Sequence, residues 1–299
     1  MPPIDHQYYY FSMVNVEQPD RIDPSLFKST AEDGAYSTLM NFIVNEQTLF
    51  RYAEEISEPM AVPDLLGKSV KASSRQFAGV YRLASQICAH LKIDVPDIYI
   101  YEGYQYLIDS NGCFTPRLEI SARMVRDFSE PEFTHCLAKE LTHIALGHIR
   151  TEVLTERMQE AIQTLASLPI VNTLNIVGGP KFYTMALRVK AFRWFREAIF
   201  TAENFATAYT GNVKASVTST LLQVFNDRRV VDEIDIAEFC DQVGLIEMVE
   251  GAAATYTKMD EVIPYAPYRV GNMLQYAASG RGIKLRHMLQ ELKRSDGSR

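Results

Sequence analysis

The sequence predicts an α+β fold that is mainly helical and contains one small antiparallel sheet. Apolar residues recur at three- and four-residue spacing over about 73–91 and again over about 181–209, which is the period of a helix with one buried face. Between these segments the period changes to two at 97–101 and 117–121, with an Asn-Gly turn signal at 111–112. Helices packed around a short sheet account for this order of patterns.

Residues 1–72 are expected to form an N-terminal extension, a helical wrap around the main domain. It begins with an aromatic cluster, passes through a segment rich in proline and aspartate, and reaches a helical pattern over about 36–56. The main domain is expected over 73–290. Charged residues dominate 291–299, which we expect to be a flexible tail.

A capping box predicts where the central helix of the main domain begins. Ser129 supplies an N-cap hydroxyl, and Glu132 supplies a carboxylate three residues later. We expect a single helix from about Glu130 to Glu152. The last third of the chain is expected to add further helices, interrupted at Pro264 and Pro267.

Composition excludes several classes of function. The 299-residue chain has a formal net charge of −7, which disfavours nucleic acid and anionic membranes as partners. Its four cysteines form no CxxC pair, which favours a reducing compartment. We expect no export signal and no membrane span, because no basic stretch precedes an early apolar segment and no apolar run reaches about 18 residues. A cytoplasmic location follows.

The segment that indicates chemistry is Lys139-Glu140-Leu-Thr-His143. On a helix, residues four apart point the same way, so histidines at 139 and 143 would chelate one metal ion with the intervening glutamate as general base. A protonated lysine has no lone pair for Zn²⁺. His135 cannot replace the missing ligand, because eight residues of helix separate it from His143 by about 12 Å.

The chain resembles the M48 family of zinc metallopeptidases over roughly 73–290. The segment from Val95 to Ile100 is similar to the phrase that opens the family's sheet, and 137–148 is similar to its active-site helix. Glu203 stands where the family takes a third zinc ligand from a later helix, with Thr207 in place of the usual aspartate. Residues 263–270 are similar to a further family segment whose histidine is missing here.

This resemblance implies a zincin-like metallopeptidase core and a role for each matching residue. Glu140 would be the general base of an active member, and His143 and Glu203 would be metal ligands, vestigial or weak here. His148 and Thr207 would support the ligands from behind. The edge strand that binds substrate would comprise Leu118, Glu119, Ile120 and Ser121.

Each of these residues also has a plainer interpretation. Lys139 is either a solvated helix residue or an ammonium that fills the place of the metal and pairs with Glu203, Glu140 or both. Without a metal, Glu140 would serve as a partner for that lysine. His143 would be a neutral core histidine, Glu203 a buried ion-pair member or a surface residue, and His148 a residue favoured by the helix dipole. The expected edge strand could equally be covered.

Two functions remain open on sequence grounds. The first is a pseudopeptidase that has lost the first zinc ligand and acts by binding a peptide or protein, with no cofactor. The second is an active zinc-dependent metalloendopeptidase with an atypical metal site and Glu140 as general base. A catalytic amine at Lys139 is disfavoured, because Glu140 and Glu203 would raise the pKa of that amine. Homo- and hetero-oligomers both remain open.

Overall fold

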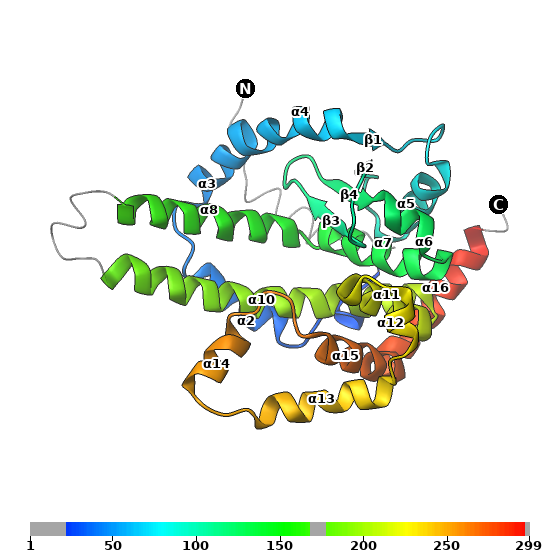
Figure 1. Cartoon of the computed structure of the whole chain (residues 1–299). Helices are drawn as coiled ribbons and strands as arrows, with labels where there is room; N and C mark the ends of the chain where they lie inside the picture. The colour runs from blue at the N-terminus through cyan, green and yellow to red at the C-terminus, as the bar shows by residue number, and fades with distance from the viewer. Residues whose placement is uncertain (1–21, 168–177, 297–299) are drawn as a thin grey trace.

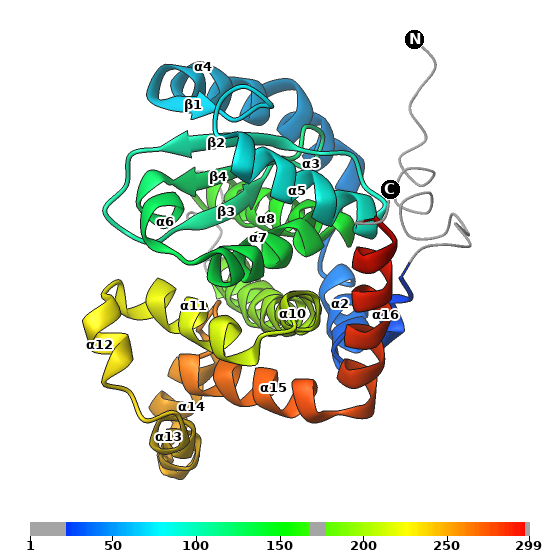
Figure 2. The same ribbon diagram turned by 90° about the vertical axis from the view of Figure 1, so that its right-hand side faces the viewer.

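The fold is organised around one long helix. The computed structural model describes residues 22–167 and 178–296, and within them α10 (Gly178–Thr210) has helices on several sides. Figure 2 shows α10 nearly end-on, close to the centre of the molecule. The helices in contact with it are α2 (Glu32–Met40), α7 (Glu130–Ala145), α8 (His148–Ser167), α11 (Val213–Phe225), α14 (Ala252–Met259), α15 (Ala266–Ala278) and α16 (Gly280–Asp296).

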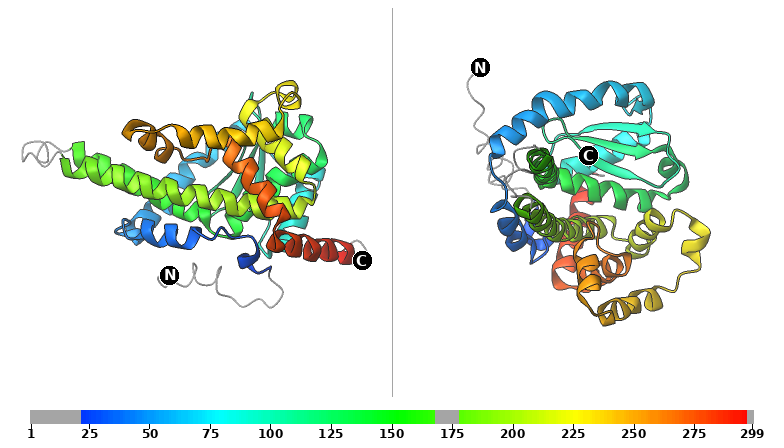
Figure 3. Two further views of the ribbon diagram at one scale, coloured as in Figure 1. Left: turned by 90° about the horizontal axis from the view of Figure 1, so that it is seen from below. Right: turned by 60° about the vertical axis from the view of Figure 1, so that its left-hand side comes forward.

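The two longest helices, α8 and α10, run side by side (Figure 1). The left view of Figure 3 shows α10 from below, with the C-terminal helix α16 (red) beside one end of it. Among the helices of the described residues, none combines the length and apolar character needed to span a lipid bilayer. The remaining helical elements are η1 (Pro24–Leu26), α3 (Glu46–Tyr52), the π-helical turn η2 (Ala53–Ser57), α4 (Glu58–Lys68), α5 (Ala78–Leu91), α6 (Ala122–Asp127), α12 (Arg228–Asp232) and α13 (Ile236–Met248).

The sheet is mixed, and the expectation of a purely antiparallel sheet is wrong. Its four strands are β1 (Ser69–Lys71), β2 (Asp97–Tyr101), β3 (Ile108–Asn111) and β4 (Arg117–Ser121), in the order β1-β2-β4-β3. β2 and β4 are parallel, whereas β1 pairs with β2 and β3 with β4 in antiparallel fashion. Alternation along a strand reports which face is buried and not the direction of the neighbouring strand, so the sequence could not reveal the parallel pair.

The described part of the chain has two apolar clusters. In the larger one, the inner face of the sheet, with Ile98 and Leu118 at most 1% exposed, belongs to the same cluster as Ile87 of α5 and Leu137 of α7. The smaller cluster joins α2 to the α8–α10 pair around the buried Trp194. The segment before residue 73 contributes to both clusters and also supplies strand β1.

The expected helix over 130–152 is interrupted by a turn. Its start is as predicted: the backbone N–H of Ser129 donates to Glu132 Oε2 at 2.8 Å, which completes the capping box. α7 then ends at Ala145, and Gly147 adopts a left-handed conformation with φ of 71° before α8 begins. The turn directs the chain so that the first residue of α8 lies against the end of α7.

Glu58 joins the N-terminal segment to the sheet. It lies at the start of α4, and its carboxylate accepts hydrogen bonds from the backbone N–H groups of Cys113 at 2.6 Å, Phe114 at 3.2 Å and Thr115 at 3.3 Å. The Thr115 hydroxyl donates to the same carboxylate at 3.1 Å. These donors belong to the turn between β3 and β4, so one anion fixes this turn.

Replacing Glu58 by alanine should destabilise the fold by about 2 kcal/mol, because several partly buried donors lose a charged acceptor. Chemical denaturation followed by circular dichroism measures this loss. Glu55→Ala removes an exposed acid from the same helical segment and serves as the control. Equal denaturation midpoints for the two variants would show that the Glu58 contacts contribute nothing.

Candidate functional site

Lys139 is enclosed by protein and paired with its neighbour on α7. Its Nζ lies 3.0 Å from Oε1 of Glu140, and the two side chains are 13% and 7% exposed. Burial disfavours the ammonium form, but nearby negative groups, the Glu140 carboxylate foremost among them, together outweigh burial and hold the pKa of Lys139 above its ordinary value. Lys139 is therefore a charged, enclosed residue and not a solvated one. A catalytic amine would need a lowered pKa, and this one is raised.

The second oxygen of Glu140 is also engaged. Ser110 of β3 donates its hydroxyl proton to Glu140 Oε2 at 2.8 Å, and both residues are buried. The Glu140 carboxylate therefore lies between the Lys139 ammonium on α7 and a hydroxyl on the sheet. No sequence pattern indicates Ser110, because residues 108–111 are too short and too polar to predict as a strand.

Glu203 forms a second buried ion pair, with Arg269 and not with Lys139. Glu203 is fully buried on α10, and its Oε1 accepts from Arg269 Nε at 2.7 Å and from Nη2 of the same guanidinium at 2.5 Å. Both arginine nitrogens reach the same oxygen. Glu203 Oε2 and the hydroxyl of Thr207, one helical turn later, have no hydrogen-bond partner among the described residues. Of the two partners considered for Lys139, only Glu140 pairs with it.

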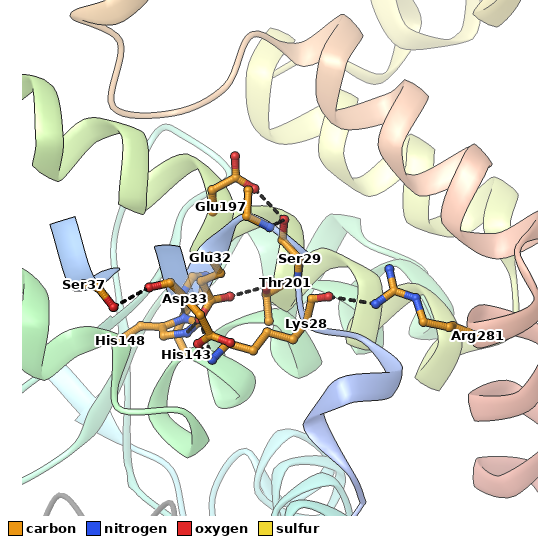
Figure 4. A network of polar contacts seen from close by, with 11 residues as sticks. Lys28, Ser29, Glu32, Asp33, Ser37, His143, His148, Glu197, Thr201 and Arg281 are labelled. Atoms are coloured by element: carbon orange, nitrogen blue, oxygen red, sulfur yellow. Dashed lines mark hydrogen bonds and ion pairs between the residues drawn. The ribbon is translucent and has the colours of Figure 1, made fainter. Parts of the chain in front are cut away.

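The side chains of His143 on α7, His148 on α8 and Glu32 on α2 form a series of contacts (Figure 4). His143 Nδ1 lies 2.9 Å from His148 Nδ1, across the Gly147 turn, and His148 Nε2 lies 3.3 Å from Glu32 Oε1. The Thr201 hydroxyl donates to the other oxygen of Glu32. His148 therefore contacts both His143 and Glu32.

Burial and neighbouring charges set the protonation of the residues in this series of contacts. Burial opposes ionisation of Glu32, but the hydrogen bonds from His148 and Thr201 and the charge of His148 hold the pKa of Glu32 below its ordinary value. Burial, followed by the charge of His148, lowers the pKa of His143 well below its ordinary value. His143 is therefore neutral. Sequence reasoning missed Glu32, because a glutamate at a helix start looks like an ordinary favourable charge at the helix dipole.

The expected substrate strand is not at an edge of the sheet. β4, which contains Leu118, Glu119, Ile120 and Ser121, lies between β2 and β3 and pairs with both. The outer strand on the side of α7 is β3. This prediction is wrong because the sequence showed no strand at 108–111, and β3 is the strand that covers β4.

The side chains at this site do not form a zinc site. A catalytic zinc centre uses three protein ligands and a water molecule. Of the expected ligands, position 139 carries an ammonium, and the bonded oxygen of Glu203 is held by Arg269. The described residues include no group of three or more His, Cys, Asp or Glu side chains placed to share a metal ion.

Comparisons with known proteins add no evidence about the function. No protein-family model, curated protein or solved structure matches the chain. The interpretation of the site therefore depends on the residues and contacts described above.

The buried ion pair on α7 makes a prediction about stability. Lys139→Met should destabilise the fold by about 3 to 5 kcal/mol at pH 7, because Glu140 keeps its charge without a cation. Adding Glu140→Gln should recover most of this loss, because glutamine carries no charge to compensate. Urea denaturation of the wild type, both single variants and the double variant measures the coupling. Additive losses would contradict a direct interaction.

His135 predicts a loss of stability in acid. Its Nδ1 contacts Ser219 Oγ at 2.9 Å, and burial lowers the pKa of His135 to about 3. Below pH 6.5 the unfolded chain binds a proton that the folded chain does not bind, so folding loses stability as pH falls from 6.5 toward 3. Between pH 7.5 and 5 the loss from this residue should be about 2 kcal/mol.

His135→Gln should remove that share of the acid sensitivity, and His287→Gln, at an exposed site, should not. Urea denaturation at several pH values compares the slopes of stability against pH. If the wild type and His135→Gln show the same slope, the folded chain must accept the proton on His135.

Proposed function

We propose that the chain is a pseudopeptidase: an M48-like zincin core that binds an extended segment of peptide or protein without cutting it. The observation that carries the proposal is the Lys139–Glu140 ion pair, in which an ammonium takes the place of the first metal ligand and holds the would-be general base. Lys139, Glu140, His143 and Glu203 follow one another along the sequence in the order of the M48 motifs. They share no metal ion here, because Glu140 pairs with Lys139 and Glu203 pairs with Arg269.

The placement of three elements supports an inherited peptidase architecture. α7, which carries Lys139, Glu140 and His143, contacts both the outer strand β3 and the long helix α10. α10 brings Glu203 into the protein interior from a distant part of the sequence. A strand edge beside a helix that carries a glutamate and a histidine is the arrangement that the family resemblance implies.

The charges explain why binding would persist without hydrolysis. A peptidase of this kind needs a Lewis acid that lowers the pKa of a bound water, and a glutamate free to take its proton. The Lys139 ammonium is a single positive charge with no site for a water ligand. Both oxygens of Glu140 are occupied, one by Lys139 and the other by Ser110. A peptide could still pair with the strand edge, because that interaction uses backbone groups.

Metal binding tests the proposal. The wild-type chain, purified without chelator, should contain no stoichiometric zinc and should not cut casein. Lys139→His should bind zinc weakly, because Arg269 still holds Glu203. Lys139→His combined with Arg269→Gln should bind at least tenfold more tightly, because both ligands are then free. Mass spectrometry of metals and competition with a zinc-binding dye give these values.

The matched control is Arg269→Gln alone, which frees Glu203 but retains Lys139 and should not gain zinc. The rival function, an active zinc metalloendopeptidase with Glu140 as general base, predicts the opposite for the wild type. One tightly held zinc per wild-type chain, lost together with proteolysis in His143→Ala, would establish the rival.

A further inference from the structure

A groove opens at the surface between α11, α12 and α13, on elements that carry none of the candidate site residues. Its volume is about 390 Å³. Phe225, the last residue of α11, contacts Phe239 of α13 edge to face, with 6.2 Å between the ring centroids, and both rings line the groove. The other lining residues are Val230, Ile234, Asp235, Glu238 and Gln242. The groove therefore combines an apolar lining with carboxylates.

One face of α13 extends this groove along the helix. The lining residues on α13 lie at three- and four-residue spacing, and the same spacing leads on to Leu245 and Val249. These two apolar side chains are 64% and 55% exposed. α13 packs against α15 through a different face, where Glu247 accepts a hydrogen bond from the hydroxyl of Tyr268. The face that continues the groove is thus left uncovered, at the periphery of the molecule in Figure 1 and Figure 2.

Negative charge surrounds this face. Neither Glu238 nor Asp241, both on α13, forms an ion pair within the described part of the chain. Of the two arginines that precede the groove segment, Arg228 is paired with Glu132. Residues 230–257 contain no lysine, arginine or histidine, and their acidic residues are Asp232, Glu233, Asp235, Glu238, Asp241, Glu247 and Glu250. A partner with positive charge is therefore attracted to this part of the surface.

The shape and the charge together indicate which partner fits. An amphipathic helix inserts its apolar side chains into such a groove and places flanking lysines or arginines beside the acids. The face between Asp235 and Val249 covers about 14 residues, or ~21 Å, which matches about four turns of a partner helix. A second copy of this chain fits less well across a twofold axis, because the same acids would then face one another.

We propose that this surface, the α13 face, binds an amphipathic helix of another protein that carries lysine or arginine beside its apolar stripe. Phe225 and Phe239 receive an apolar anchor of that helix, and Leu245 extends the contact. Glu238 and Asp241 pair with its basic side chains. The inference goes beyond the proposed function, because the α13 face shares no residue with the candidate site.

Fluorescence anisotropy with two matched peptides tests the charge. The first is a fluorescein-labelled peptide of about 15 residues, built from alanine with leucine at three- and four-residue spacing and lysine on both sides of that stripe. The second has glutamine in place of each lysine, which keeps a similar helix propensity and removes the charge. The lysine peptide should bind the wild-type chain about tenfold more tightly, and added salt should reduce this preference.

Variants on exposed positions test the location. Leu245→Gln should weaken the binding of both peptides about fivefold, because it removes an apolar contact. Glu238→Gln combined with Asp241→Asn should abolish the preference for lysine. The matched controls are Leu66→Gln on α4 and Glu291→Gln on α16, which remove the same groups from exposed sites elsewhere and should change neither affinity.

Four outcomes would overturn the inference. Equal binding of the two peptides by the wild type would exclude a basic partner, and no binding of either peptide would exclude the docking surface. Loss of binding in Leu66→Gln but not in Leu245→Gln would place the contact on α4. If sedimentation of the chain alone showed a dimer that Leu245→Gln dissociates, the occupant of the α13 face would be a second copy.

Discussion

The structure around α7 and α10 depends on the neutralisation of two buried carboxylates. Glu140 and Glu203 both lie inside the protein, where an unpaired negative charge would cost several kcal/mol. The chain compensates each with its own cation, Lys139 in one case and Arg269 in the other. A divalent metal could neutralise both carboxylates at once, whereas two separate cations divide the site into two independent pairs. This division explains how Glu140 and Glu203 can both be enclosed here without sharing a ligand.

Local patterns in the sequence were sufficient to predict α5, α10 and the start of α7. The capping box at Ser129 located the start of α7 because capping is a contact between residues three apart. For Lys139 the sequence left two interpretations open, and the structure has the enclosed one, next to the Glu140 carboxylate. The end of the helix was not predictable in this way, because the apolar pattern continues through Ala145 and a left-handed glycine at 147 has no strong flanking signal.

The parts of the site that escaped prediction come from distant segments. Ser110, Arg269 and Glu32 reach the site residues only through the packing of β3, α15 and α2. Ser110 and Glu32 look unremarkable in their own neighbourhoods of the sequence, and the segment around Arg269 does not reveal its pairing with Glu203. The contact of Glu32 with His148 also changes the view of the N-terminal segment: it is more than a wrap, because it supplies the anion at the end of the histidine chain.

The Lys139–Glu140 pair also has an evolutionary consequence. No single-nucleotide change converts a lysine codon into a histidine codon, and the intermediate residues on that route are asparagine and glutamine, which carry no charge. Each intermediate would leave the enclosed Glu140 without its cation. A substitution route from Lys139 to histidine therefore passes through a less stable protein, and this cost favours retention of the Lys139–Glu140 pair.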